Sequence, residues 1–598
     1  MNNMIDNKFS VGYYKCNLID IVSLEQNYIP STSDLHIGYN PFCIDKLQNY
    51  NPIYDNLFSL SKKNYNSIQL NHNKHIVSFH SIIDMSNIEY NKEIFFKYSP
   101  LLDPLRYMVG KYEDNTDLLH NLPVSISVSN NISHNVISKI SSPHNCAYVD
   151  TFFYYLSSMT LQKHKILNCL DFYGSFLGIQ KKYKYDVSDD IDYLTESSFF
   201  INNNNRLFTL QNVNLNEYLN DDSRKQRPKL CISKSNHNIS AISIANSLTG
   251  FDDITDITNE TLDNCIVYEN NTQLSSKNLE GSENEKSDDN SSIAYTTDTD
   301  DDEHDNISEN DNNSDSDNDN ISENDNNSDE SEWETSSDTS NDDSTHEEEQ
   351  YVYINNYPVQ MICLEKCDGT FDELFTSGNA TVENTASALF QVVMTLIIYQ
   401  KLFSFTHNDL HTNNIMYIKT DIPFLFYKYD NIIYKVPTYG RIYKIIDFGR
   451  SIYRFNGTTY CSDSFGPGGD ADTQYNCEPF FNNKKPRLEP NMSFDLCRLG
   501  CSIYDFIIPE HLNYDDYDEL QKTIHRWCLD DNKKNVLYKS NGDERYPDFK
   551  LYKMIARTVH KHTPQEQLKH SFFNQFVINN NEYIEEHLMD INCLPKYY

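Results

Sequence analysis

The 598-residue sequence predicts an α+β fold that is interrupted by a long acidic insert. Short runs with the alternation typical of β-strands gather in residues 76–185. A long apolar helix pattern, Thr385–Phe403, stands out in residues 351–598. Between these two parts lies a stretch with too few apolar residues to form a core of its own.

Residues 1–75 are polar, rich in Asn and Tyr and weakly periodic, and we interpret them as an N-terminal extension. Residues 76–185 have the pattern of strands around one amphipathic helix. In chain order we expect the strands His75–Ile83 and Glu93–Lys97, the helix Ala147–Leu161 and the strand Cys169–Ile179.

Residues 186–350 form the predicted insert, which is acidic from about residue 275. Between Ser282 and Glu349 there are 27 Asp and Glu residues and one Lys, so this segment carries −26 of the net charge of −39. Such a segment repels itself and is expected to be disordered, either as a solvated spacer or as a regulatory element. A basic protein is the partner that it would attract, more strongly if serines with an acidic residue three positions on were phosphorylated. These serines are Ser308, Ser314, Ser322 and Ser331.

Two short motifs in residues 351–598 carry the chemistry. The first is His407-Asn-Asp-Leu-His-Thr-Asn-Asn414, and the second is Asp447-Phe-Gly449. They supply a carboxylate, then an amide, then a second carboxylate on a glycine turn. Phosphoryl transfer needs one carboxylate to orient the attacking hydroxyl and oxygen ligands to hold Mg²⁺ on the phosphates of ATP. The order of the groups therefore predicts an ATP- and Mg²⁺-dependent transfer site.

This pair of motifs, H-x-D-L-x-x-x-N and then D-F-G, resembles the catalytic core of the protein kinase superfamily. The resemblance covers residues 76–185 and 351–598, and it implies a two-lobed fold with the insert in the small lobe. It implies that Asp409 is the catalytic base, with His407 and His411 in the same catalytic loop. It also implies that Asn414 and Asp447 are the metal ligands. Of these, His407 is expected to hold the loop rather than to carry a proton.

The same resemblance assigns the nucleotide contacts. Lys97, at the end of a strand, would contact the α- and β-phosphates and pair with Asp150 on the helix that follows. The strand that runs from Tyr357 into Glu365 resembles the last small-lobe strand and the hinge. In that case Leu364 is the gatekeeper, and the backbone of Glu365 and Cys367 meets the adenine edge. Further on, Asp495-Leu-Cys-Arg-Leu-Gly500 resembles the helix whose aspartate anchors the catalytic loop.

Several departures from the family pattern have chemical consequences. No glycine-rich phosphate loop can precede Lys97, because only Gly12 and Gly38 occur before it. The helix partner of Lys97 is an aspartate where the family has a glutamate. Asn408 replaces the usual arginine, so we expect no cation beside the base and no need for phosphorylation of the loop that contains Thr458 and Thr459.

The leading interpretation is an ATP-dependent kinase that phosphorylates Ser or Thr on a protein substrate. A pseudokinase that binds partners and a small-molecule kinase of the same fold remain alternatives. Asp409, Asn414 and Asp447 are all present, which favours activity, whereas the missing glycine loop argues against it. The pattern around Asp495 and the closing Leu568–Phe573 favour a protein substrate.

Composition indicates which partners and which cellular compartment to expect. Outside the acidic segment the charge is only mildly negative, so a nucleic-acid partner is not expected. The 14 cysteines form no C-x-x-C pair, and we expect free thiols in a reducing, intracellular compartment, with no secretion signal and no membrane span. Abundant Asn, Ile and Tyr resemble the proteins of giant DNA viruses of the mimivirus type, a composition that some protists share. If the protein is viral, we expect it in host cytoplasm or virion.

Overall fold

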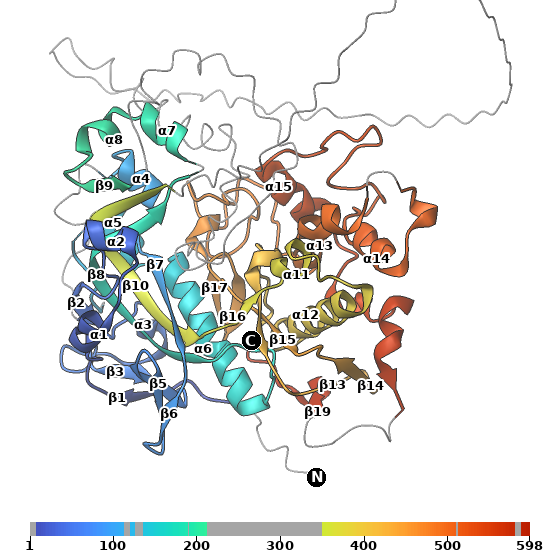
Figure 1. The fold of residues 1–598 in the computed structure, drawn as a ribbon, viewed down its shortest axis with the longest axis horizontal. Coiled ribbons are helices and arrows are strands. Elements are labelled where there is room, and N and C mark those ends of the chain that lie inside the picture. Colours follow the sequence, from blue (N-terminus) through green and yellow to red (C-terminus); the bar gives the residue numbers. More distant parts are fainter. Residues whose placement is uncertain are drawn as a thin grey trace, which may run out of the picture. The chain divides into compact units, whose positions relative to one another are not determined.

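The computed structural model describes residues 8–112, 120–125, 135–188, 190–211, 350–509, 512–579 and 588–598. These residues form α-helices and several separate β-sheets, in agreement with the α+β class (Figure 1). One extended hydrophobic core contains side chains from both the N-terminal and the C-terminal part. The acidic segment Ser282–Glu349, with its four candidate serines, lies outside the described residues.

The main sheet of the N-terminal part has five strands in the order β2, β8, β10, β7, with β9 paired to the start of β10. The strands are β2 (Ile44–Gln48), β7 (Ile94–Pro100), β8 (Phe172–Asp186), β9 (Phe208–Gln211) and β10 (Tyr351–Glu365). All of these pairs are antiparallel. Ile362 of β10 lies opposite Lys97 of β7. The register therefore places Lys97 three residues before the end of β10.

Two strands of this sheet come from residues that the sequence pattern assigns elsewhere. β2 belongs to the predicted N-terminal extension, and β9 belongs to the predicted insert. Two short helices, α7 (Ile191–Glu196) and α8 (Ser198–Asn203), lead from β8 to β9. Gln211 at the end of β9 is the register partner of Tyr351 at the start of β10. The chain thus leaves the sheet and returns to it at neighbouring positions.

The remaining N-terminal elements are short. The sequence pattern predicts one strand over His75–Ile83, whereas the structure has a hairpin that turns at Phe79 and His80. The small sheets are β1 (Tyr13–Lys15) with β3 (Ile68–Leu70), and β4 (Lys74–Ser78) with β5 (Ser81–Asp84) and β6 (Glu89–Asn91). The short helices are α1 (Ile21–Asn27), α2 (Thr32–Ile37), α3 (Tyr54–Leu57), α4 (Pro104–Met108) and α5 (Asn135–Ser141).

The helix α6 (Cys146–His164) packs against β8 and β10 (Figure 1). It begins where the side chain of Asn145 accepts the N–H of Ala147, a favourable N-cap. It ends at Lys165, which has a left-handed φ of 58°. All residues from Ala147 to Thr160 are buried, so both its polar and its apolar side chains face other parts of the protein.

The helix α12 (Val382–Phe403) is the central helix of the C-terminal part. Thr381 and Asn384 form a reciprocal capping box at its start, and Ser404 ends it with a left-handed φ of 51°. By length and mean hydropathy (1.5) it could cross a membrane, which the sequence pattern did not suggest. However, 94% of its most apolar window is buried inside the protein, as in a core helix.

The C-terminal part also contains several sheets and shorter helices. The sheets are β11 (Gly369–Thr370), β12 (Ile415–Lys419) and β15 (Arg441–Ile445); then β13 (Phe424–Tyr429), β14 (Ile432–Pro437), β18 (Val577–Ile578) and β19 (Leu588–Asp590); then the hairpin β16 (Ile452–Phe455) and β17 (Thr458–Cys461). The helices are α11 (Asp372–Thr376), α13 (Phe494–Ile507), α14 (Glu519–Trp527), α15 (Phe549–Thr558) and α16 (Pro564–Gln567). The hairpin of β13 and β14 lies between the two motifs in the sequence.

The pairing of β9 with β10 predicts that the stability of the folded part does not depend on the acidic segment. Because β9 and β10 hold the ends of the intervening chain together, its length should matter little: doubling a loop costs about 0.6 kcal/mol. Replacing Ser282–Glu349 with a short Gly/Ser linker should leave the melting temperature within about 2 °C of wild type. Differential scanning calorimetry of the two full chains measures this. A fall of 5 °C or more would show that the segment stabilises the core.

Candidate active site

Asp495 fixes the backbone of the first motif. It lies in the first turn of α13 and is fully buried. Its Oδ2 accepts the N–H of His407 at 2.9 Å, and its Oδ1 accepts the N–H of Asn408 at 2.8 Å. Asn408 has a φ of 65°, in the left-handed region, so these bonds hold a strained backbone. Burial raises the pKa of Asp495 to about 7, although the two N–H bonds oppose the rise. The predicted contact between Asp495 and this loop is confirmed.

His407 is a structural member of the loop. Its Nε2 donates to the carbonyl of Ile446 at 2.8 Å, and its Nδ1 accepts the N–H of Asp409 at 3.3 Å. Both bonds need the neutral ring with the proton on Nε2. Burial lowers the pKa of His407 to about 4. The side chain therefore links the first motif to the residue before Asp447 and is uncharged at neutral pH.

Asn414 and His411 are connected to each other. The Nδ2 of Asn414 donates to the carbonyl of Asp409 at 2.9 Å and to Nε2 of His411 at 3.0 Å. These two bonds fix the rotation of the amide, so the Oδ1 atom of Asn414 is the only one that could ligate a cation. Asn414 sits in a 3-10 turn directly before β12 and is buried.

Lys97 lies between two carboxylates that are far from it in the sequence. Its Nζ is 2.9 Å from Asp150 of α6 and 2.9 Å from Asp447, and all three side chains are buried. Burial raises the pKa of Asp150 to about 6 despite the neighbouring ammonium. Burial alone would also raise the pKa of Asp447, but the charge and hydrogen bond of Lys97 hold it below its usual value. The predicted contact between Lys97 and Asp150 is thus present, although the aspartate side chain is shorter than the glutamate of the family.

Helix α6 also holds the backbone of the second motif. The N–H of Phe448 donates to Oδ1 of Asp150 at 2.8 Å, and the N–H of Asp447 donates to the hydroxyl of Tyr154 at 2.8 Å. Asp447 has a left-handed φ of 58°, so these bonds support a second strained position. Phe448 is fully buried against Phe153 and Tyr154. The sequence pattern missed Tyr154, although its place four residues after Asp150 puts both on one face of the helix.

The predicted hinge residues lie at the end of β10. Leu364 is buried between Phe95 of β7 and Phe172 of β8 in the register of the sheet. The N–H of Glu365 donates to the carbonyl of Asp171 at 3.0 Å, so this amide cannot meet an adenine edge. The carboxylate of Glu365 pairs with Lys444 at 2.7 Å and with Lys92 at 3.0 Å. Cys367 lies just beyond and is partly buried, and its role as a hinge amide stays a prediction.

The predicted absence of a cation beside the base is wrong. Arg450, the residue after Asp447-Phe-Gly449, places its Nη1 atom 3.6 Å from Oδ2 of Asp409. The other oxygen of Asp409 accepts the hydroxyl of Tyr552 on α15 at 2.9 Å. Asn408, which replaces the expected arginine, donates to the carbonyl of Arg450 at 3.1 Å. Sequence reasoning did not identify Arg450 and Tyr552, because neither residue is part of the two motifs.

The candidate metal ligands suit Mg²⁺ by their chemistry. The N–H of Ile446 donates to the carbonyl of Asn414 at 3.0 Å, which brings the two ligand positions side by side. An amide oxygen and a carboxylate are hard donors, and Mg²⁺ normally completes its shell with water and phosphate oxygens. The described residues contain no group of three or more His, Cys, Asp and Glu side chains that could hold a metal alone.

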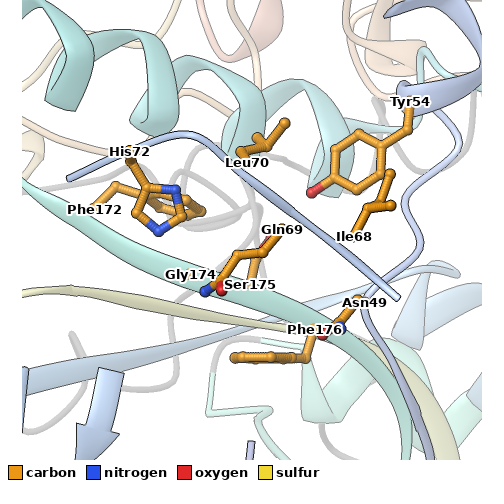
Figure 2. A pocket seen from close by; sticks show the side chains of 10 residues that line it. All are labelled: Asn49, Tyr54, Ile68, Gln69, Leu70, His72, Phe172, Gly174, Ser175 and Phe176. Atoms are coloured by element: carbon orange, nitrogen blue, oxygen red, sulfur yellow. The ribbon is translucent and has the colours of Figure 1, made fainter. Parts of the chain in front are cut away.

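A small cavity lies elsewhere, between β3 and β8. Figure 2 shows the ring of His72 and the hydroxyl end of Tyr54 among the side chains that line it. Its other lining residues come from β3, β8 and Asn49. None of them is a candidate site residue, so this cavity is separate from the Lys97 cluster.

Comparison with known proteins leaves the family open. A scan against protein-family models found no match. The chain is similar to "Uncharacterized protein 098R" of Invertebrate iridescent virus 6, with 42% identity over 177 residues. The aligned region covers 29% of this chain and 26% of that viral protein, so the chain matches about a quarter of its relative.

The neutral state of His407 predicts acid sensitivity. Its pKa is about 4 in the folded chain and about 6.5 when unfolded, so the unfolded state binds the extra proton between these values. The contribution to stability is complete above about pH 6.5 and is lost as the pH falls toward 4, by about 3 kcal/mol in all. Urea unfolding at pH 7 and pH 5 should show a larger loss for wild type than for His407→Gln. Asp495, with a raised pKa, acts in the opposite direction but equally in both proteins. Equal losses would contradict the assignment.

Tyr154→Phe tests the support of the second motif. The variant leaves the N–H of Asp447 buried without its acceptor, which should lower the free energy of unfolding by about 1–3 kcal/mol. Tyr453→Phe is the matched control, because the Tyr453 hydroxyl is also buried and donates to a carbonyl of α6, that of Val149, at 2.8 Å. Urea unfolding should show a loss in both variants. Only Tyr154→Phe should also weaken the effect of Mg²⁺-ATP on melting temperature by half or more. The same ligand effect in both variants would refute a specific role.

Proposed function

We propose that this protein is an ATP-dependent kinase that transfers the γ-phosphate to Ser or Thr hydroxyls of a protein substrate. The observation that carries the proposal is the Lys97 cluster. Strand β7, helix α6 and the second motif each contribute one charge, and the three meet within 2.9 Å. A buried cation with two buried carboxylates is costly to assemble, and such clusters of perturbed groups gather at functional sites.

The roles are those that the resemblance to protein kinases implies for each side chain. Lys97 would neutralise the α- and β-phosphates, and Asp150 would hold Lys97 in place. Asn414 and Asp447 would hold Mg²⁺, which supplies charge neutralisation on the β- and γ-phosphates. Asp409 would accept a hydrogen bond from the attacking hydroxyl and align it. The Asp495 anchor and the closing Leu568–Phe573 pattern support a protein substrate over a small molecule.

A second candidate is a nucleotide-binding protein that does not transfer phosphate. Asp409 supports it, because Tyr552 already donates to one of its two carboxylate oxygens. The lack of a glycine-rich loop before Lys97 supports it as well. The two candidates share the nucleotide site and differ only in turnover.

Asp447→Asn tests nucleotide binding, with the melting temperature without ligand measured for each protein as the baseline. Wild type should gain several degrees of melting temperature with Mg²⁺-ATP, because a ligand at 100 times its Kd stabilises the folded state by about 2.7 kcal/mol. Asp447→Asn should lose most of that gain and any transfer of labelled γ-phosphate to a generic Ser/Thr substrate. Asp430→Asn, in the exposed turn between β13 and β14, is the control and should behave as wild type.

The outcomes discriminate the candidates. Mg²⁺-ATP binding with phosphate transfer supports the kinase. Binding without transfer, at any substrate tested, supports the second candidate instead. No binding by wild type overturns both.

A further inference from the structure

The residues that follow the second motif contain two carboxylates that contact other elements of the site. Asp463, in a 3-10 turn after β17, accepts the backbone N–H of Cys146 at 3.0 Å. Cys146 is the first residue of α6, so the carboxylate sits at the positive end of the helix dipole. The same carboxylate pairs with Lys139 of α5 at 2.7 Å. The backbone N–H of Asp463 donates to the carbonyl of His144 at 2.7 Å. Asp463 thereby attaches this segment to the helix that carries Asp150.

Asp470 makes the second attachment. Its Oδ2 accepts Nη2 of Arg450 at 2.5 Å and Nε at 3.1 Å. The Nη1 atom of the same guanidinium lies 3.6 Å from Asp409. Arg450 and Asp409 are almost completely buried, and Asp470 is only slightly exposed. Burial strengthens these interactions and makes an unpaired charge costly.

The carboxylate of Asp409 is therefore oriented from both sides. Oδ2 faces Arg450, and Oδ1 accepts the hydroxyl of Tyr552. That hydroxyl in turn accepts Nε of Arg498 at 2.8 Å. Loss of Asp470 would leave Arg450 with Asp409 as its nearest buried anion, and the guanidinium would move toward it.

We infer that Asp463 and Asp470 are positioning residues, fixed charges that assemble α6 and the catalytic loop without phosphorylation of the chain. The inference rests on the proposed function for its kinetic readout. A phosphorylated residue would supply negative charge at such a place only after modification, whereas these carboxylates are always present. Thr458 and Thr459 lie in β17, opposite Phe455 and Arg454 of β16.

The test uses Asp470→Asn and Asp470→Glu in the full chain, with Asp472→Asn as the matched control. Asp472 lies two residues away and accepts the N–H of Gly468 at 3.1 Å. Asp470→Asn should lower kcat at least tenfold while the KM for ATP stays within twofold, because the change affects the base and not the nucleotide site. Asp470→Glu should recover part of kcat, and Asp472→Asn should match wild type.

Phosphorylation is tested separately. Wild type treated with a phosphatase, and shown by mass spectrometry to carry no phosphate, should keep its kcat within twofold. Loss of activity on this treatment would overturn the inference. An unchanged kcat in Asp470→Asn would overturn it as well.

Hydrogen exchange supplies a readout that does not need turnover. In unphosphorylated wild type the amides of His407 and Asn408 should be strongly protected, and Asp470→Asn should exchange them at least tenfold faster. Asp463→Asn should do the same to the amides of Cys146 and Phe448. If wild type transfers no phosphate but shows these changes, the proposed function fails and the positioning role stands. If the protection is unchanged in both variants, the positioning role fails whatever the activity.

Discussion

The pairing of one buried ammonium with two buried carboxylates is the constraint on which the site depends. Lys97 comes from the sheet, Asp150 from α6 and Asp447 from the turn after β15, so the three charges meet only when these elements are packed together. Removing one member of a buried ion cluster typically costs about 3–5 kcal/mol, because the remaining charge has no solvent. The cluster thus makes correct packing of the sheet, the helix and the second motif a single cooperative event.

Around this cluster the backbone is held in two strained positions. Asn408 and Asp447 both have left-handed φ values, and each N–H group is donated to a buried acceptor on a helix. Asp495 of α13 supports the first, and Tyr154 of α6 supports the second. His407 connects the two turns through the carbonyl of Ile446. Strain of this kind persists only where the surroundings over-determine it, which is typical of sites that must present side chains at fixed angles.

Much of this site could be predicted where residue order alone determines proximity. Asp409, Asn414 and Asp447 lie in short motifs whose spacing implies their arrangement, and Asp495 was found in the same way. Lys97 and Asp150 followed from the resemblance of their strand and helix to those of protein kinases.

Long-range partners could not be predicted in this way. Tyr154, Arg450 and Tyr552 act through contacts whose sequence separations carry no pattern, and Arg450 reverses the expectation drawn from Asn408. The fold shows the same limit. Strands β2 and β9 are short and lie in polar surroundings, so periodicity could not show that they complete a sheet.

The pairing of β9 with β10 has a mechanical consequence for anything that binds the acidic chain between them. A pull on that chain loads Gln211 and Tyr351 together, at the same end of the sheet. β9 has only four residues paired with β10, whereas β8 pairs along almost the whole of β10, so β9 would separate first. β10 would still be held by its long pairing with β8. Lys97 of β7 pairs with Ile362, near the opposite end of β10. Under tension the β9–β10 pair would therefore separate before the Lys97 cluster was disturbed.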